Sequence, residues 1–484
     1  MPRLSSLIVL LLGICSGCTS GFEAVNDDPH AMTEVPAAEL LTGAQRDLVT
    51  LVLGAGFEGT GTYGLHYVQH LSQTRKTGVT RYDDATTSFY GFYIGGLMDL
   101  QTIVDGYAAG EGSYVEVSQG QEAVARILRG WAYLTMTDCW GDLPYSQALR
   151  GGENAAPAYD DQETIYRGVV ADLLLAADAM GQDFIAGDVI YDGDPLRWQR
   201  FANSLILRAG IRVADVAPAL GKQWVEQALR RGVIEDNVDA AQLVYTGDEY
   251  ATNSFSYDAL FSYNYAVSEP LVEFLRERQD PRLPVFAQPT WESQRYGPDA
   301  YVGMPYGVTE AEAEAFPYDS LSFPGERFVS TTSPSVLLAY SEVLFNRAEA
   351  AARGWTQEDA PALYVAAVSA SMEQFGISDE AAIAAYLKQE SVAYRPNAFR
   401  KSIGEQKWVA LYFQGMEAWS EWRRLGHPKL APAPAPILVN TIPTRRGYPR
   451  EEATLNRENY QQALQRQFGG DKDPLNGRVW WDVN

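Results

Sequence analysis

The sequence predicts a mainly α-helical protein, because it contains one clear helical hairpin, several further amphipathic segments and little strand pattern. The hairpin runs from Ser335 to Phe375, and its first arm stops at Gly354. Apolar residues recur at helical spacing in the first arm, while small and large residues share one face of the second. The spacing from Ala348 through Gly354 to Tyr364 is typical of a tetratricopeptide unit. One such unit cannot bury its own apolar faces, so we expect several to stack.

The first residues of the chain have the layout of a secretory signal peptide, which we place at 1–17. Arg3 precedes an apolar run that is too short to span a membrane, and small residues follow. The sequence Ser-Gly-Cys ending at Cys18 resembles a bacterial lipobox, in which this cysteine is diacylated. Cys15 is the alternative site, and an ordinary signal peptide with a chance cysteine is the other interpretation. Residues 18–36 are polar and contain prolines, so we expect a lipidated tether.

Beyond the tether we expect one domain, 37–484, with a helical scaffold at about 37–240 and 330–425. Helices in this scaffold are predicted by 3.6-residue periodicity and by capping residues at their ends. Apart from the hairpin, the segments predicted to be helical are 37–53, 88–104, 119–137, 159–179, a helix starting at Pro195, 267–278 and 403–425.

The scaffold is interrupted by an aromatic-rich insert at about 241–329, where helical periodicity fades apart from the segment 267–278. Tyrosine, tryptophan and phenylalanine are interspersed there with glycine, proline, serine and asparagine. A long segment with little regular structure inside a compact protein is usually functional. Tyrosine and tryptophan combine a flat apolar face with a polar tip, which suits a binding surface, although core packing is their commonest use.

Three motifs suggest cofactor or metal sites but lack the required context. Residues 54–59 match GxGxxG, yet the glycines that follow favour a loop over the helix that a dinucleotide site needs. His66 and His70 are four residues apart, but Tyr67 occupies the position of the zincin glutamate and a third ligand is missing. The acidic loop 188–194 lacks the EF-hand order, so helix capping is the better interpretation. We therefore expect no cofactor and no metal.

Composition excludes two kinds of partner. The formal net charge of −24 argues against nucleic acid and against direct binding to an anionic membrane face.

Two of the three cysteines lie in the first 18 residues, which leaves Cys139 alone. No disulfide framework or zinc site is therefore available to the rest of the chain.

Several segments, in one order from the lipobox to the last five residues, resemble the SusD/RagB family of nutrient-binding outer-membrane lipoproteins, in its SusD-like branch. No single segment is decisive, but their shared order is highly specific. The segments are FEAVNDDP, TDCWGDLPYSQAL, YDDQETIY, GDVIYDGDPLRWQRFANSLILRAGIR, EVLFNRAEAAARGW, QKWVALYFQGMEAWSEWRRLGHP, RRGYPREEATLN and VWWD.

The resemblance implies four tetratricopeptide-like helix pairs with an irregular ligand-binding region packed against them. It also implies a lipid-anchored location on the cell surface, at the outer membrane, and a partner, a SusC-like TonB-dependent transporter. Members of the family capture oligosaccharides or, in some cases, peptides, and pass them to that transporter. The family as such has no catalytic activity, so we expect a binding protein and not an enzyme.

The expected ligand-binding residues are chosen for their context in exposed loops, since no ligand motif of the family can be matched here. A sugar presents a face of C–H groups that stacks on an aromatic ring, and its hydroxyls need polar partners. For stacking we expect Tyr82, Tyr257, Tyr263, Trp291, Tyr296 and Tyr301, and for polar contacts Arg81, Asp83 and Asn264.

Three alternatives to an oligosaccharide-binding protein remain open. A peptide could use the same surface through its backbone groups and side-chain pockets. A glycoside hydrolase needs two carboxylates, and with 62 acidic residues some pair will always lie at a suitable separation. No GxSxG or HExxH motif supports an enzyme. Paired helices would also suit a protein that only binds other proteins.

Overall fold

The computed structural model describes residues 35–54, 61–83, 88–110, 115–248, 251–256, 264–296 and 300–484. Within these ranges the chain is mainly helical, as the sequence predicted. The strands of the described residues form three separate two-stranded antiparallel pairs: β1 (Leu71–Gln73) with β5 (Tyr265–Val267), β2 (Leu143–Pro144) with β3 (Tyr159–Asp160), and β4 (Ala241–Leu243) with β6 (Ser335–Leu338).

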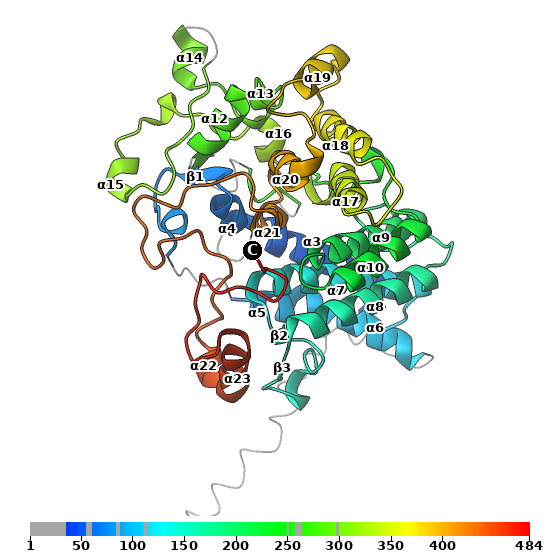
Figure 1. Cartoon of the computed structure of the whole chain (residues 1–484). Coiled ribbons are helices and arrows are strands. Elements are labelled where there is room, and N and C mark those ends of the chain that lie inside the picture. Colours follow the sequence, from blue (N-terminus) through cyan, green and yellow to red (C-terminus); the bar gives the residue numbers. More distant parts are fainter. Residues whose placement is uncertain are drawn as a thin grey trace, which may run out of the picture.

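The first part of the scaffold is a row of helices that pack on their neighbours in the sequence (Figure 1). Their ends follow from local chemistry: Ser118 and Gln121 form a capping box at the start of α7, and Asp194 caps α9 ahead of Pro195. The helices are α3 (Ala37–Leu53), α6 (Met98–Ala109), α7 (Gln119–Trp140), α8 (Gln162–Ala179), α9 (Pro195–Arg212) and α10 (Pro218–Arg231).

The second part of the scaffold contains the predicted hairpin, formed by α17 (Tyr340–Ala352) and α18 (Ala360–Gln374). Helix α17 packs on α18, α9 and α20, and so joins the two parts of the scaffold. The further helices here are α19 (Glu380–Leu387), α20 (Phe399–Ala410) and α21 (Gly415–Leu425).

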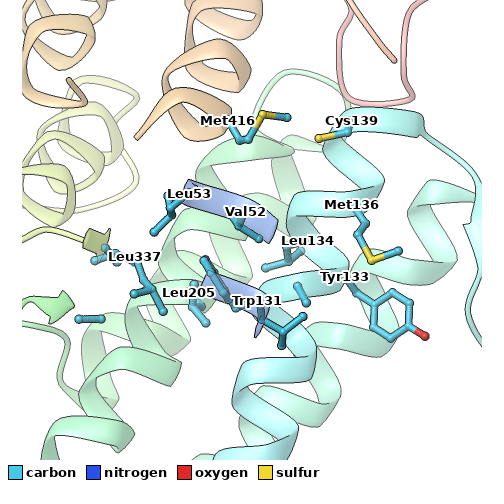
Figure 2. Packing of buried hydrophobic residues seen from close by; sticks show 14 of the residues in the cluster. Val52, Leu53, Trp131, Tyr133, Leu134, Met136, Cys139, Leu205, Leu337 and Met416 are labelled. Atoms are coloured by element: carbon cyan, nitrogen blue, oxygen red, sulfur yellow. The ribbon is translucent and has the colours of Figure 1, made fainter. Parts of the chain in front are cut away.

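The main hydrophobic core lies where α3, α7, α9 and α21 meet. Figure 2 shows Val52 and Leu53 of α3 beside Leu134 of α7, Leu205 of α9 and Met416 of α21. All five are buried in one cluster, apart from small exposed fractions. Side chains from distant parts of the sequence therefore fill one continuous core, which is the packing that stabilises helices of this length.

A buried ionic network joins α7, α9, α17, α20 and α21 next to this core. Arg424 donates to Glu349 (2.6 Å) and to Glu421 (2.7 Å), and Lys407 also donates to Glu421 (2.7 Å). Burial alone would raise the pKa of Glu421, but Arg424 and Lys407 hold it well below its usual value. The charges are therefore compensated inside the scaffold, as buried charges must be.

The insert is a set of short helices that lies above the scaffold in Figure 1. Its elements are β4, β5, α12 (Glu269–Glu277), α13 (Leu283–Phe286), α14 (Trp291–Tyr296), α15 (Glu310–Ala313), η5 (Tyr318–Ser320) and α16 (Glu326–Val329). The remaining short elements are α4 (Gly61–Tyr67), η1 (Val79–Arg81), α5 (Tyr90–Phe92), the π-turn η2 (Tyr93–Leu97), η3 (Gly151–Glu153), η4 (Asn237–Asp239), η6 (Pro396–Ala398), α22 (Glu452–Leu455) and α23 (Arg457–Phe468).

Four predicted elements need correction. Residues 335–338 are strand β6 and not the start of the hairpin helix, because they pair with β4. The predicted helix 403–425 is two helices, separated by a turn at Phe413, whose φ is +66°. Segment 88–104 contains the π-turn η2 between α5 and α6, and helix 159–179 begins at Gln162 because Tyr159 and Asp160 form β3.

The glycine-rich sequence after Leu53 was expected to be a loop, yet helix α4 begins at Gly61. Residues 55–60 lie outside the described residues. A Cβ on Gly64 would lie 2.2 Å from the carbonyl carbon of Gly415, so α4 and α21 touch backbone to backbone. The prediction was wrong because glycine here serves close helix contact, which local propensity does not record.

Candidate functional site

Two strand pairs hold the insert against the scaffold. Leu71 pairs with Val267 in the β1–β5 pair, and Ala241 pairs with Leu338 in the β4–β6 pair. Inside the insert, backbone bridges join Ser268 to Met304 and Ala287 to Pro324. These contacts connect segments far apart in sequence, so the position of the insert is decided by tertiary pairing.

A buried arginine fixes the insert to the hairpin side of the scaffold. The guanidinium of Arg282 donates to both carboxylate oxygens of Asp280, at 2.9 and 2.7 Å. It also donates to Ser371 of α18, to Tyr386 of α19 and to Gln406 of α20. Both charged side chains are fully buried, so this is a satisfied bidentate pair in the interior.

Aromatic rings fill the junction between the insert and the turn that separates α20 from α21. Phe286 stacks on Tyr412, and Phe328 stacks on Phe413 with ring centroids 4.8 Å apart. Phe255 meets Phe413 edge to face at 5.0 Å. Such pairs contribute about 0.5–1.5 kcal/mol each beyond the area that they bury. The inner rings of the insert therefore have a structural role.

A narrow cleft lies beside these rings, between the insert and the scaffold, and encloses about 570 Å³ of space when the open solvent at its mouth is included. Its lining combines flat rings with amide and guanidinium groups: Phe255, Phe328, Phe375, Tyr412 and Phe413, with Gln242, Asn253, Arg327, Gln374 and Gln414.

Two features of the cleft point to ligand binding. Phe413 is partly exposed there and has a φ of +66°, a backbone conformation that costs energy for a bulky residue and is frequent at functional sites. The Oε1 atom of the neighbouring Gln414 is buried and has no hydrogen-bond partner within the described ranges. The apolar face of a ligand would stack on the ring of Phe413, and a hydroxyl group of the ligand would donate the hydrogen bond that Oε1 of Gln414 lacks.

The outer face of the insert carries further aromatic side chains. The exposed fraction of Trp291 at the start of α14 is 43%. Arg75 lies over the ring of Tyr318, 4.9 Å from its centroid, and η5 packs on α14. Tyr301 is half-buried, and its carbonyl accepts a hydrogen bond from Arg276. Of the predicted stacking residues whose side chains are described, Trp291 is thus the most accessible.

The prediction for Tyr82 needs correction. Its exposed fraction is 0%, its hydroxyl accepts a hydrogen bond from the Ala433 amide at 2.8 Å, and burial raises its pKa. A ring without an exposed face cannot stack on a ligand. The error arose because the loop 430–437 covers this tyrosine, and no local pattern in the sequence predicts that contact.

Of the three predicted polar residues, Arg81 contacts this covering loop. Arg81 donates through Nε to the Ala435 carbonyl at 2.7 Å, and it accepts from Ile437 through its own carbonyl. Asp83 is half-buried, and its amide donates to Gly78 in the same turn. Asn264 is also half-buried, and its carbonyl accepts from Thr74 beside the β1–β5 pair.

Some predicted residues fall outside what the structure describes. Tyr257 and Tyr263 lie outside the described residues, as does the lipidation residue Cys18. Tyr296 ends helix α14, and only its backbone is described.

The two histidines near α4 are core residues. His66 and His70 are fully buried, and each has one ring nitrogen next to a backbone carbonyl, of Leu71 and Trp408 respectively. Burial lowers the pKa of His66 to about 4 and that of His70 to about 3, so both are neutral.

The acidic loop 188–194 provides a helix cap, as predicted, because Asp194 accepts from the amides of Leu196 and Arg197 at the start of α9. Asp188 holds the loop itself by accepting from the amides of Ile190 and Gly193 and from the indole of Trp198. Among the described residues there is no cluster of three or more potential metal-ligating His, Cys, Asp or Glu side chains. Within the same ranges no helix combines the length and apolarity needed to cross a bilayer.

Sequence reasoning missed the residues that line the cleft from the scaffold side. Phe413 and Gln414 were placed inside one continuous helix, and Phe375 was treated as the end of the hairpin. Gly415, directly after them, is the one local signal that could have indicated a break. The cleft itself arises only where three distant segments meet.

The fold and this site define a helical scaffold protein with an aromatic insert and a narrow cleft between the two. A family model, SusD-like_2, described as starch-binding and associating with the outer membrane, matches residues 29–449. The chain therefore belongs to the SusD-like family, which confirms the resemblance seen in the sequence. No curated protein matches the chain significantly.

Solved structures share the fold along almost the whole chain. One, a chitin-binding protein, is 29% identical with a TM-score of 0.80 and covers 93% of this chain and 100% of its own. A chitin-binding SusD homolog from Flavobacterium johnsoniae is 24% identical, with a TM-score of 0.77, covering 92% of this chain and 99% of its own. A SusD homolog from Bacteroides fragilis is 23% identical, with a TM-score of 0.78, covering 92% of this chain and 100% of its own. The last two support the fold alone.

Proposed function

We propose that this protein is a cell-surface lipoprotein that binds an oligosaccharide and delivers it to a SusC-like TonB-dependent transporter in the outer membrane. The observation that carries the proposal is the cleft between insert and scaffold in a chain of the SusD-like family. The family description names starch, and a relative with 29% identity is named for chitin binding. Both are neutral polysaccharides, so we assign the ligand to this class.

The chemistry of the cleft suits a sugar. The partly exposed ring of Phe413 offers a flat apolar surface for the C–H face of a pyranose. The amide groups of Gln242 and Gln414 at the same cleft can exchange hydrogen bonds with sugar hydroxyls. Trp291, exposed on the outer face of the insert, offers a separate stacking surface for a sugar ring. Binding without cleavage needs no nucleophile and no pair of catalytic carboxylates.

We place the mature protein at the outer membrane, on the cell surface, anchored by acyl chains on Cys18. Each buried methylene contributes about 0.8 kcal/mol to membrane binding, so several chains hold the protein firmly. The transporter would receive the ligand by a population shift. A saccharide that touches both proteins stabilises the closed pair by its differential affinity for that state.

Isothermal titration of the full-length protein in detergent, with chitin- and starch-derived oligosaccharides, tests the ligand class. Trp291→Ala and Gln414→Leu should each weaken binding about tenfold, the loss of one stacking or hydrogen-bond contact. Phe184→Ala, at a ring that is 74% exposed and outside the cleft, should leave affinity unchanged. Binding of peptides but of no saccharide would contradict the proposal and favour the peptide alternative.

Three further measurements test the remaining parts of the proposal. Chromatography after incubation with the protein should recover the oligosaccharide intact. Hydrolysis of the oligosaccharide that disappears when one carboxylate is substituted would instead show that the protein is an enzyme.

Metabolic labelling with a fatty acid should fail in Cys18→Ala and persist in Cys15→Ala. Purification from the outer membrane should recover a TonB-dependent barrel with the protein, and recovery of none would refute the transporter partner.

A further inference from the structure

A second open hollow lies at the opposite end of the molecule from α14, between the start of α6 and the loop 144–157 (Figure 1). It consists of an apolar part of about 840 Å³ and a polar part of about 1410 Å³. Both parts are lined by Met98, Leu149 and Arg150, so they adjoin. Together they form one open surface, away from the cleft described above.

The apolar part is built from tyrosine rings that other groups hold in place. The hydroxyl of Tyr90 donates to the buried carboxylate of Glu452, which also accepts from Tyr159 at 2.5 Å. The hydroxyl of Tyr93 donates to the Pro144 carbonyl at 2.6 Å. Rings fixed by such contacts lose little entropy when a ligand binds.

The edge of the apolar part is unusually exposed. The exposed fraction is 80% for Ile94 and 69% for Leu455, although both side chains line the hollow. Apolar side chains on two separate elements thus frame the ring surface and would be covered by a ligand lying on it.

The polar part contains a buried hydroxyl group without a partner. Tyr133 lines this part, is only 1% exposed, and its hydroxyl has no hydrogen-bond partner among the described residues. Figure 2 shows its ring pointing away from the hydrophobic cluster around Trp131. A buried unpaired hydroxyl disfavours the empty site, and a bound hydroxyl group would satisfy it.

The charges around the hollow favour a neutral ligand. Arg129 is already engaged by Gln101 at 2.6 Å and Asp172 at 2.7 Å, and Glu452 by the two tyrosines. The remaining charged groups of the lining are one positive side chain, Arg150, and two negative ones, Asp105 and Glu153. The hollow therefore has no excess of positive charge that would attract an anion, and only a small excess of negative charge that would attract a cation.

We propose that this hollow is a second saccharide-binding site, which takes a neutral oligosaccharide segment with its C–H faces on Tyr90 and Tyr93 and its hydroxyls toward Tyr133 and Arg150. The inference rests on the proposed function, because it assigns the same ligand class to a separate surface. It gives the protein two places at which one long glycan, or two chains, can be held before transport.

Two variants test the site with matched controls. Ala148→Trp fills the hollow at a position shared by both parts, and Ala156→Trp places the same ring on the same loop outside the lining. Tyr133→Phe removes the unpaired hydroxyl, and Tyr107→Phe removes a hydroxyl from α6 outside the hollow. Titration of the full-length protein in detergent uses chito- and malto-oligosaccharides, and thermal unfolding is followed in parallel.

We expect the wild-type protein to bind more than one saccharide per chain, and Ala148→Trp to bind fewer than Ala156→Trp. Tyr133→Phe should weaken the second site about tenfold while its melting temperature stays equal or rises, which a purely structural hydroxyl would not produce. If the wild type binds saccharide and all four variants match it, the second site is refuted while the cleft proposal stands. If the wild type binds none, the proposed function itself fails. If Ala148→Trp abolishes the binding of a neutral peptide and leaves saccharide binding unchanged, the proposed ligand class is wrong.

Discussion

The ring of Phe286 stacks on the ring of Tyr412, with centroids 4.4 Å apart and planes 16° from parallel. Phe286 belongs to the insert, and Tyr412 to the turn after α20 in the scaffold. The hydroxyl of Tyr412 also donates to the Phe286 carbonyl at 3.2 Å. Tyr412 lines the cleft together with Phe328 of the insert, so Phe286 supports from behind a wall that both regions build.

Truncating this contact should destabilise the whole protein. Phe286→Ala removes a fully buried ring and leaves a cavity, which typically costs about 3–5 kcal/mol of unfolding free energy. Chemical denaturation measures the change. The control Phe184→Ala, at an exposed ring, should stay within about 0.5 kcal/mol. Equal losses in both variants would contradict the docking role of Phe286.

The second prediction concerns the buried pair of Arg282 and Asp280. Arg282→Met leaves Asp280 buried without its partner, which should lower the unfolding free energy by about 3–5 kcal/mol. The double variant Arg282→Met/Asp280→Leu should lose less than the two single changes together, since no lone charge remains. For comparison, Arg167→Met breaks a surface pair with Glu163 and should cost about 0.2–1 kcal/mol. If the loss in the double variant equals the sum of the losses in the two single variants, Arg282 and Asp280 do not stabilise each other.

The third prediction tests the backbone contact between α4 and α21. A Cβ on Gly415 would lie 2.4 Å from the Gly61 carbonyl oxygen, so Gly415→Ala forces the helices apart and should cost about 1–3 kcal/mol or more. A Cβ on Gly152 would meet open space, so Gly152→Ala should change stability by no more than about 0.5 kcal/mol. Melting temperatures of the two variants give the comparison, and a stable Gly415→Ala protein would rule out the close approach.

The fourth prediction is a pH dependence from His66 and His70. Both are neutral in the fold, whereas in the unfolded chain they titrate near 6.5, so protons bind preferentially to the unfolded state below that pH. Their contribution is complete above pH 6.5 and is lost as the pH falls toward about 4 for His66 and about 3 for His70. The loss approaches ~1.4 kcal/mol per pH unit for each histidine.

Denaturation between about pH 7 and pH 5 checks this dependence. The variant His66→Gln/His70→Gln should show a shallower fall of unfolding free energy than the wild type, whatever its absolute stability. His427→Gln, at a half-buried histidine, should retain most of the wild-type slope. Identical slopes in all three proteins would mean that the pKa values of the buried histidines are the same in the fold as in the unfolded chain.

Much of the scaffold could be predicted from local sequence. Helix α3 spans Ala37–Leu53 as expected, and α18 follows the small-residue face of the second hairpin arm. Asp194 and Pro195 fix the start of α9. These features follow from side-chain periodicity and capping, which depend on neighbours within a few residues. The division into a scaffold and an aromatic-rich insert at about 241–329, which was based on composition, stays a prediction.

The sequence by itself thus determined the helical class and the family. Only the tertiary structure decided that Ser335–Leu338 is a strand, that a turn at Phe413 interrupts the predicted helix and that Tyr82 is covered. Each of these features involves a contact with a segment more than 80 residues away in the chain. Strand β6 pairs with β4, Phe413 stacks on Phe328, and Tyr82 is covered by loop 430–437. Periodicity records which face of an element is apolar, whereas the exposure of a ring depends on which distant element packs over it.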